Sequence, residues 1–266
     1  DKFSLHGVGY SSRYQGGRER LGHGIESDDY VSAEILEGHA LMIDRGAFGR
    51  GAVRKYWLAQ DFIRSIALDE IEIVELVSGD IHRQIIVWKS GACVYVNRGA
   101  GDWGVAGKTL PQYGYFAKNG RIESVIERID GVIVEQSRGP SGDYFNARAF
   151  NGAGRRGIWP AGRWNEKKTP IDFGPVVTEG AFRCRRQGNM VVVTPLPDND
   201  SFTMEMAVDE IIAGGGLQVK SISAVDENGE KIRSVEYYEE ANRVKFRTRS
   251  KDFAYHLLLT EGSKDE

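Results

Sequence analysis

The feature that most constrains the fold of this chain is a change in hydrophobic periodicity near Leu68. Before Leu68, apolar residues recur at three- and four-residue spacing, which is typical of amphipathic helices. After Leu68, apolar residues alternate with polar ones or form short runs bounded by Gly, Asn and Asp, which is typical of antiparallel strands. The chain is therefore expected to be mainly β, with a short helical segment near its start.

Two helices are expected in this first segment, at residues 28–44 and 53–67. The first follows Ser27 and Asp28, which can cap a helix, and contains Gly38 as a weak point. The strands expected after Leu68 are 71–77, 84–88, 93–97, 113–117, 122–129, 132–137, 144–149, 181–186, 190–196, 202–208, 219–225, 235–238, 243–248 and 254–260.

A Gly-, Pro- and charge-rich stretch from 151 to 175 interrupts the strands and is typical of a linker or a long surface loop. The predicted domains are a barrel-end remnant (1–68), a first antiparallel β domain (69–150), the linker (151–175) and a second β-sandwich domain (176–266). The predicted fold class is thus mainly β: a short N-terminal α/β segment with two helices, followed by two antiparallel β-sandwich-like domains.

Charge and hydropathy exclude some partners. The chain has 266 residues, with 35 Lys and Arg against 38 Asp and Glu, for a net charge of −3. This balance argues against nucleic acid or an anionic membrane as a partner. No apolar run approaches the roughly 18 residues of a membrane span. Because the sequence begins at Asp1 without Met or a signal peptide, it is expected to be a piece of a longer protein.

The densest group of polar side chains lies in a Gly-rich stretch just before the first expected helix. One interpretation is a ligand-contacting loop, and the other is a solvated loop whose Ser27 or Asp28 caps the helix. A catalytic acid/base pair is disfavoured, because carboxylates at a helix N-terminus are held ionised and sequence neighbours rarely face each other across a substrate. No catalytic residue is assigned, and the candidate contact residues are His6, Tyr10, Arg13, Tyr14, Arg18, His23, Glu26, Asp28 and Asp29.

No cofactor or metal is expected. The five histidines show no paired metal-ligand spacing, and no glycine-rich stretch has the spacing of a phosphate-binding loop. Cys93 and Cys184 fit buried thiols, and they could form a disulfide only if the fold brings them together.

Trp103, between Asp102 and Gly104, either stacks on a sugar ring or packs in the core.

Three stretches resemble the end of a (β/α)-barrel bacterial glycoside hydrolase and the small β domains that follow such barrels. The resemblance covers about residues 5–117. The stretches are Gly22-His23-Gly24-Ile25-Glu26-Ser27-Asp28-Asp29-Tyr30, Ser90-Gly91-Ala92-Cys93-Val94-Tyr95-Val96-Asn97 and Leu110-Pro111-Gln112-Tyr113-Gly114-Tyr115.

This resemblance implies a C-terminal accessory fragment of a glycoside hydrolase-like, carbohydrate-active protein, extracellular or periplasmic, that supports an upstream catalytic barrel of the same polypeptide. The implied ligand is a polysaccharide or oligosaccharide. A barrel needs about 250 residues, so its catalytic carboxylates are expected upstream and the fragment alone is expected to be inactive. The alternatives are a stand-alone carbohydrate-binding module and purely structural β domains.

Overall fold

The computed structural model describes residues 27–41, 49–149, 164–212, 217–240 and 242–261. These residues form two compact units: unit 1 contains the described residues up to 141 with 164 and 165, and unit 2 contains 142–149 and those from 166 onward. The expected mainly β, antiparallel class is confirmed.

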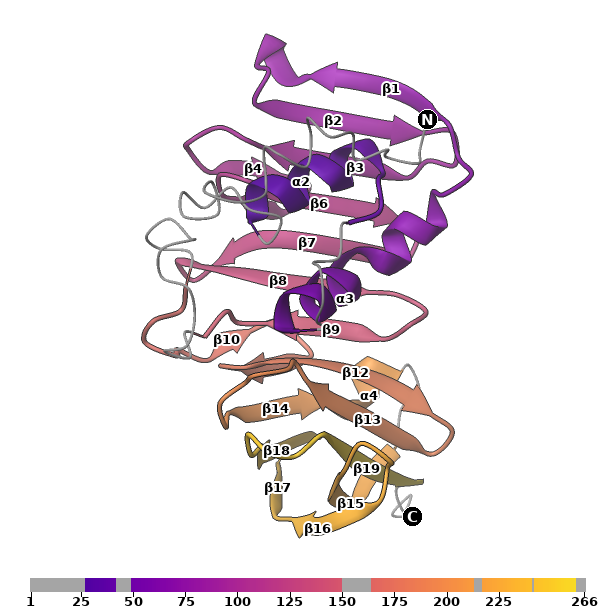
Figure 1. The fold of residues 1–266 in the computed structure, drawn as a ribbon, viewed down its shortest axis with the longest axis vertical. Coiled ribbons are helices and arrows are strands. Elements are labelled where there is room, and N and C mark those ends of the chain that lie inside the picture. Colours follow the sequence, from indigo (N-terminus) through magenta and orange to yellow (C-terminus); the bar gives the residue numbers. More distant parts are fainter. Residues whose placement is uncertain (1–26, 42–48, 150–163, 213–216, 241, 262–266) are drawn as a thin grey trace. The chain divides into compact units, whose positions relative to one another are not determined.

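Unit 1 combines two helices with an antiparallel sheet of order β1-β2-β3-β6-β7-β8 and a separate β4-β5 ribbon (Figure 1). Its elements are α2 (Asp28–Glu37), α3 (Arg50–Ser65), β1 (Ile71–Leu76), the 3-10 turn η2 (Val77–Gly79), β2 (Arg83–Trp88), β3 (Cys93–Asn97), β4 (Trp103–Val105), β5 (Lys108–Leu110), β6 (Gly114–Asn119), β7 (Ile122–Ile129) and β8 (Val132–Arg138).

Helix α2 begins and ends at local sequence signals. The Ser27 hydroxyl accepts a hydrogen bond from the backbone N–H of Tyr30 at 3.2 Å, as an N-cap does. Gly38 adopts the left-handed conformation (φ 73°), which ends the helix at Glu37. The expectation of a helix reaching residue 44 was wrong for this reason, since the capping preference of Gly38 outweighs the apolar spacing beyond it.

The two helices lie on one face of the sheet, with α2 against β2, β3 and β6 and α3 against β6, β7 and β8 (Figure 1). The β4-β5 ribbon contributes Trp103 and Leu110 to a hydrophobic cluster on the opposite face, where they meet Phe116 and Val125. The predicted domain boundary lies at Leu68, whereas the compact unit joins the helices to the strands that follow them.

Strand β1 is the edge of this sheet and differs from its neighbours in exposure. It pairs with β2 alone, and all six of its residues are exposed. Ile73 and Val74 are 48% and 64% exposed, with Glu72 and Glu75 beside them. The unit therefore presents an apolar edge strand that carries two carboxylates.

Unit 2 contains two antiparallel sheets, of orders β9-β12-β13-β19-β15-β16 and β10-β11-β14-β18-β17. Its elements are β9 (Asp143–Asn146), β10 (Ile171–Asp172), β11 (Val176–Thr178), β12 (Ala181–Gln187), β13 (Met190–Pro195), β14 (Thr203–Ala207), α4 (Val208–Ile212), β15 (Leu217–Val225), β16 (Lys231–Val235), β17 (Tyr237–Glu240), β18 (Arg243–Arg247) and β19 (Ala254–Glu261).

Aromatic side chains join the two sheets of unit 2. Phe246 of β18 and Tyr255 of β19 lie with ring centroids 5.4 Å apart, and the ring of Phe202 stacks on that of Phe182 in β12. The single strand expected at 235–238 is instead two strands in different sheets, separated by Glu236. None of the described helices is both long and apolar enough to cross a membrane.

Candidate functional site

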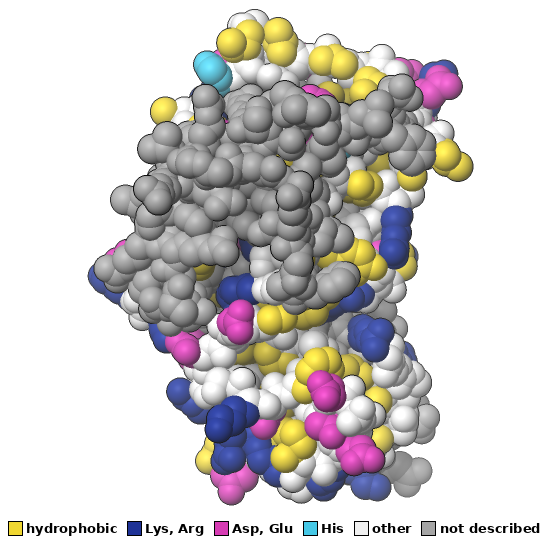
Figure 2. Space-filling view, viewed as in Figure 1, with side chains coloured by type: hydrophobic (Ala, Val, Ile, Leu, Met, Phe, Trp, Pro, Cys, Tyr) yellow, Lys and Arg dark blue, Asp and Glu magenta, His cyan; other side chains and the backbone are white. Residues whose placement is uncertain are grey.

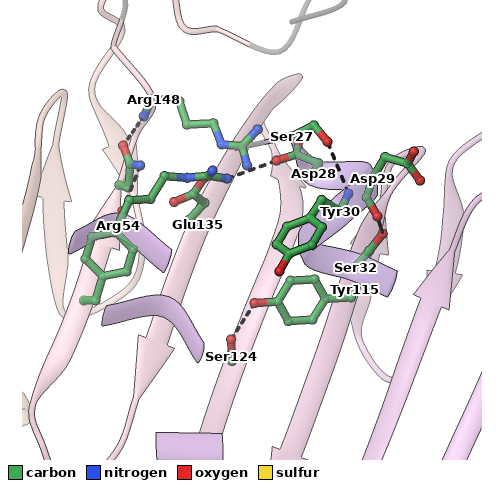
Figure 3. Close-up of polar contacts among 12 residues, drawn as sticks. Ser27, Asp28, Asp29, Tyr30, Ser32, Arg54, Tyr115, Ser124, Glu135 and Arg148 are labelled. Carbon is green, nitrogen blue, oxygen red and sulfur yellow. Dashed lines mark hydrogen bonds and ion pairs between the residues drawn. The ribbon is translucent and has the colours of Figure 1, made fainter. Parts of the chain in front are cut away.

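A buried ion cluster ties the start of α2 to α3 and to the sheet of unit 1 (Figure 3). The Arg54 Nη2 atom of α3 lies 3.1 Å from Asp28 Oδ1 and 2.6 Å from Glu135 Oε1. The side chains of all three residues are at most 8% exposed. One guanidinium thus bridges two carboxylates from different elements, because its planar donors can serve both at once.

Asp29, the next residue of α2, is held by a second guanidinium. Its carboxylate forms an ion pair with Arg98, which follows β3, and Asp29 is only 1% exposed. The Arg98 guanidinium also lies over the ring of Tyr113, 5.6 Å from its centroid. The two candidate carboxylates near the start of α2 therefore face arginines and are shielded from solvent.

A hydroxyl pair completes the polar contacts beneath the helices. The Tyr115 hydroxyl lies 2.7 Å from the Ser124 hydroxyl, which donates to the Leu58 carbonyl of α3 at 2.6 Å (Figure 3). Burial raises the pKa of Tyr115, so its hydroxyl stays protonated. The Tyr115 and Ser124 hydroxyls thus bond to each other and to the backbone of α3, and these bonds can align the helix on the sheet.

The structure describes three of the sequence-predicted site residues, Asp28, Asp29 and Trp103. Asp28 and Asp29 are brought together with Arg54 and Arg98, as described above. Trp103 is 9% exposed and packs edge-on against Tyr95 in the hydrophobic cluster of the β4-β5 face. The other candidates lie outside the described residues: His6, Tyr10, Arg13, Tyr14, Arg18, His23 and Glu26.

Unit 2 contains a groove of about 620 Å³ that sequence reasoning missed. Its lining comes from β14, β16, β17 and β18 and the segments that flank them, and it includes an exposed aromatic ring, several hydroxyls and four cationic side chains. The residues that line the groove include Thr203, Arg233, Glu236, Tyr238, Lys245, Arg247 and Arg249.

Strand pairing sets the arrangement in this groove. Tyr238 of β17 lies directly opposite Lys245 of β18, and Thr203 of β14 lies directly opposite Arg247. Residues opposite each other in an antiparallel pair project from the same face of the sheet. The ring of Tyr238 is 76% exposed. An aromatic ring, a hydroxyl and cations therefore share one outward face.

One local signal for this face was present in the sequence. From Lys245 to Arg249 the residues alternate between exposed cations and buried Phe246 and Thr248, as one face of a strand requires. The pairing of this row with Tyr238 follows only from the register of β17 against β18, which the linear pattern does not contain.

Metal binding and disulfide formation find no support in the part of the chain that the structure describes. There, no group of three or more His, Cys, Asp or Glu side chains is arranged to hold a metal ion. Within the described residues, neither Cys93 nor Cys184 is joined in a disulfide.

Comparisons with known proteins assign no family to this fold. No protein-family model matches the chain, and no curated protein or solved structure matches it significantly.

Proposed function

We propose that this chain is an accessory, saccharide-contacting portion of a glycoside hydrolase-like, carbohydrate-active protein, without catalytic activity of its own. The observation that carries the proposal is the outward face of unit 2, where Tyr238 stands opposite Lys245 beside a groove of about 620 Å³. Sugar rings stack their C–H faces on aromatic rings, and their hydroxyls pair with polar side chains beside the ring.

The polar cluster of unit 1 supports the accessory part of this proposal. Asp28 and Glu135 converge on Arg54, and Asp29 pairs with Arg98, all largely shielded from solvent. Hydrolysis of a glycosidic bond needs two carboxyl groups that flank the substrate. In this proposal, unit 1 is a support, and the chemistry belongs to an upstream barrel of the same polypeptide.

The β-sandwich interpretation belongs to the same proposal. Phe246 and Tyr255 bring the two antiparallel sheets of unit 2 into contact, which supports a sandwich-like arrangement of the kind that presents ligands on a sheet face.

Affinity electrophoresis of the full chain in gels that contain neutral or acidic polysaccharides tests this function. We expect at least one glycan to retard the chain, and Tyr238→Ala to weaken that binding by about 3- to 10-fold, because a stacking surface is lost. The matched control is Phe253→Ala, since Phe253 is 54% exposed and does not line the groove.

Unchanged mobility on every glycan would contradict the proposal and favour purely structural β domains. Equal losses in the Tyr238→Ala and Phe253→Ala variants would also contradict it, because the effect would then not belong to the groove.

A further inference from the structure

The groove of unit 2 is positively charged although the chain as a whole is not. Four cationic side chains line it, Arg233, Lys245, Arg247 and Arg249, against the single carboxylate of Glu236. The chain has a net charge of −3, so this concentration of cations does not follow from its composition. Figure 2 shows Lys and Arg side chains gathered over the region where Figure 1 places β17 and β18.

Two of these cations are engaged by neighbouring carboxylates and two are not. Arg233 forms an ion pair with Asp252, and Lys245 Nζ lies 3.8 Å from Glu205 Oε2. Arg247 and Arg249 are exposed, and within the described chain neither forms a side-chain ion pair. Their charges are therefore available to an external anion.

The backbone that carries these two arginines is fixed. Thr248, between them, is 1% exposed; its backbone N–H donates to the Phe202 carbonyl at 2.8 Å, and its hydroxyl accepts from the Phe202 N–H at 3.0 Å. The backbone N–H of Arg249 donates to the Tyr255 hydroxyl at 2.6 Å. Burial raises the pKa of Tyr255, which keeps this hydroxyl protonated. Binding would thus immobilise side chains only, at little backbone cost.

The spacing of the row indicates a polymer with repeated charges. Lys245 and Arg247 occupy alternate positions of β18, so their Cα atoms lie about 7 Å apart on one face, and Arg249 follows two residues beyond the end of the strand. A single small anion would engage one of them, whereas an extended polyanion can engage the arginines in succession. Guanidinium groups bind carboxylates and sulfates through two parallel hydrogen bonds.

We propose that Arg247, Arg249 and Tyr238 form a binding site for an acidic polysaccharide, one that carries carboxylate or sulfate groups along its chain. This inference rests on the proposed saccharide contact and names its ligand class. Nucleic acid is the less favoured polyanion, because it calls for an overall basic domain and several stacking rings, and here Tyr238 is the one exposed aromatic ring in the described lining of the groove.

The test compares binding of the full chain to polygalacturonate, dextran sulfate, neutral dextran and single-stranded oligo-dT. We expect the chain to bind polygalacturonate, dextran sulfate or both. We expect its affinity for neutral dextran to be at least about tenfold lower than for the acidic polymer that it binds. Arg247→Gln/Arg249→Gln should lose at least about tenfold in affinity for the acidic polymer, because two charge-assisted contacts are removed. Polygalacturonate and dextran sulfate distinguish carboxylate from sulfate recognition.

The matched control is Lys118→Gln/Arg121→Gln, which removes the same charge from exposed positions of the β6-β7 hairpin in unit 1. We expect this control to bind the acidic polymer as tightly as the unmodified chain does. Both this control and Arg247→Gln/Arg249→Gln should have the melting temperature of the unmodified chain. Arg247→Lys/Arg249→Lys should retain part of the affinity, since charge is kept and the two-pronged geometry is lost.

The inference is overturned by equal binding of dextran and dextran sulfate with no binding of polygalacturonate. Equal losses of affinity in both charge-removal variants, or tighter binding of oligo-dT than of either acidic polysaccharide, also overturn it. Retardation by a neutral glycan that depends on Tyr238 and not on the arginines would overturn this inference alone. The absence of binding to every glycan would overturn the proposed function as well.

Discussion

At the scale of single residues, Arg54 is the most consequential side chain of unit 1. It satisfies two buried carboxylates from α2 and β8, and so couples the position of the helices to the sheet. A buried charge that loses its partner costs far more than the pair contributes in net stability. The arginine is therefore expected to tolerate substitution poorly.

Arg54→Met should lower the free energy of unfolding by about 3 to 5 kcal/mol, because Asp28 and Glu135 would lose their shared guanidinium. Arg54→Lys should fall between this variant and the unmodified chain. Urea denaturation followed by circular dichroism measures the difference. Arg64→Met, at an exposed position of the same helix, is the control and should change stability by no more than about 0.5 kcal/mol. Equal stability of the Arg54→Met and Arg64→Met variants would contradict the prediction.

At the scale of elements, the turn that leads into β6 explains why the motif Leu110-Pro111-Gln112-Tyr113-Gly114-Tyr115 has its glycine. Asn97 of β3 donates through its side-chain amide to the Leu110 carbonyl at 2.8 Å, and its backbone carbonyl accepts from the Tyr113 N–H. A Cβ added at Gly114 would lie 2.5 Å from Pro111 Cδ and 2.8 Å from the Ile126 carbonyl oxygen. Glycine is required there by space.

Gly114→Ala should accordingly destabilise unit 1 by about 1 to 3 kcal/mol, as overpacking at a rigid site does. Gly104→Ala in β4 is the matched control, because no atom lies within 4 Å of its added Cβ. Thermal denaturation of both variants provides the comparison. The prediction fails if the two melting temperatures are the same.

Local signals account for the elements that the sequence predicted well. Strands β7 and β8 closely match their expected ranges because short apolar runs lie on both sides of Asp130-Gly131, whose positive φ angles of 49° and 81° suit a tight hairpin. β4, β5, β10 and β11 have two or three residues each, too few for any periodicity to be visible. The groove face was missed because Tyr238 and Lys245 become neighbours only through strand register.

At the scale of the whole molecule, the carboxylates that pair with Arg54 and Arg98 in unit 1 differ in exposure from Arg247 and Arg249 in unit 2. Asp28, Asp29 and Glu135 are buried and paired with arginines, whereas Arg247 and Arg249 of the groove are exposed. This division fits the proposed accessory role, in which one unit supports and the other contacts a ligand.

The chain alone should show no hydrolysis of the polysaccharides to which it binds, because Asp28, Asp29 and Glu135 are buried and paired with guanidinium groups, whereas hydrolysis needs two carboxyl groups that flank the substrate. A reducing-end assay on the same glycan panel measures this, with an active glycosidase as the positive control. Turnover by the purified chain that Asp28→Asn or Glu135→Gln abolishes, with folding retained, would contradict the accessory assignment.

The exposed edge of β1 sets a condition for handling this protein in solution. An unpaired edge with apolar side chains is a template on which a second strand can add. If two copies paired β1 antiparallel about its centre, Glu72 of each copy would face Glu75 of the other. Like charges opposed in this way repel, and salt screens the repulsion over a Debye length of about 10 Å at 0.1 M. Ionic strength therefore controls how well the two glutamates protect this edge from fibre-like association.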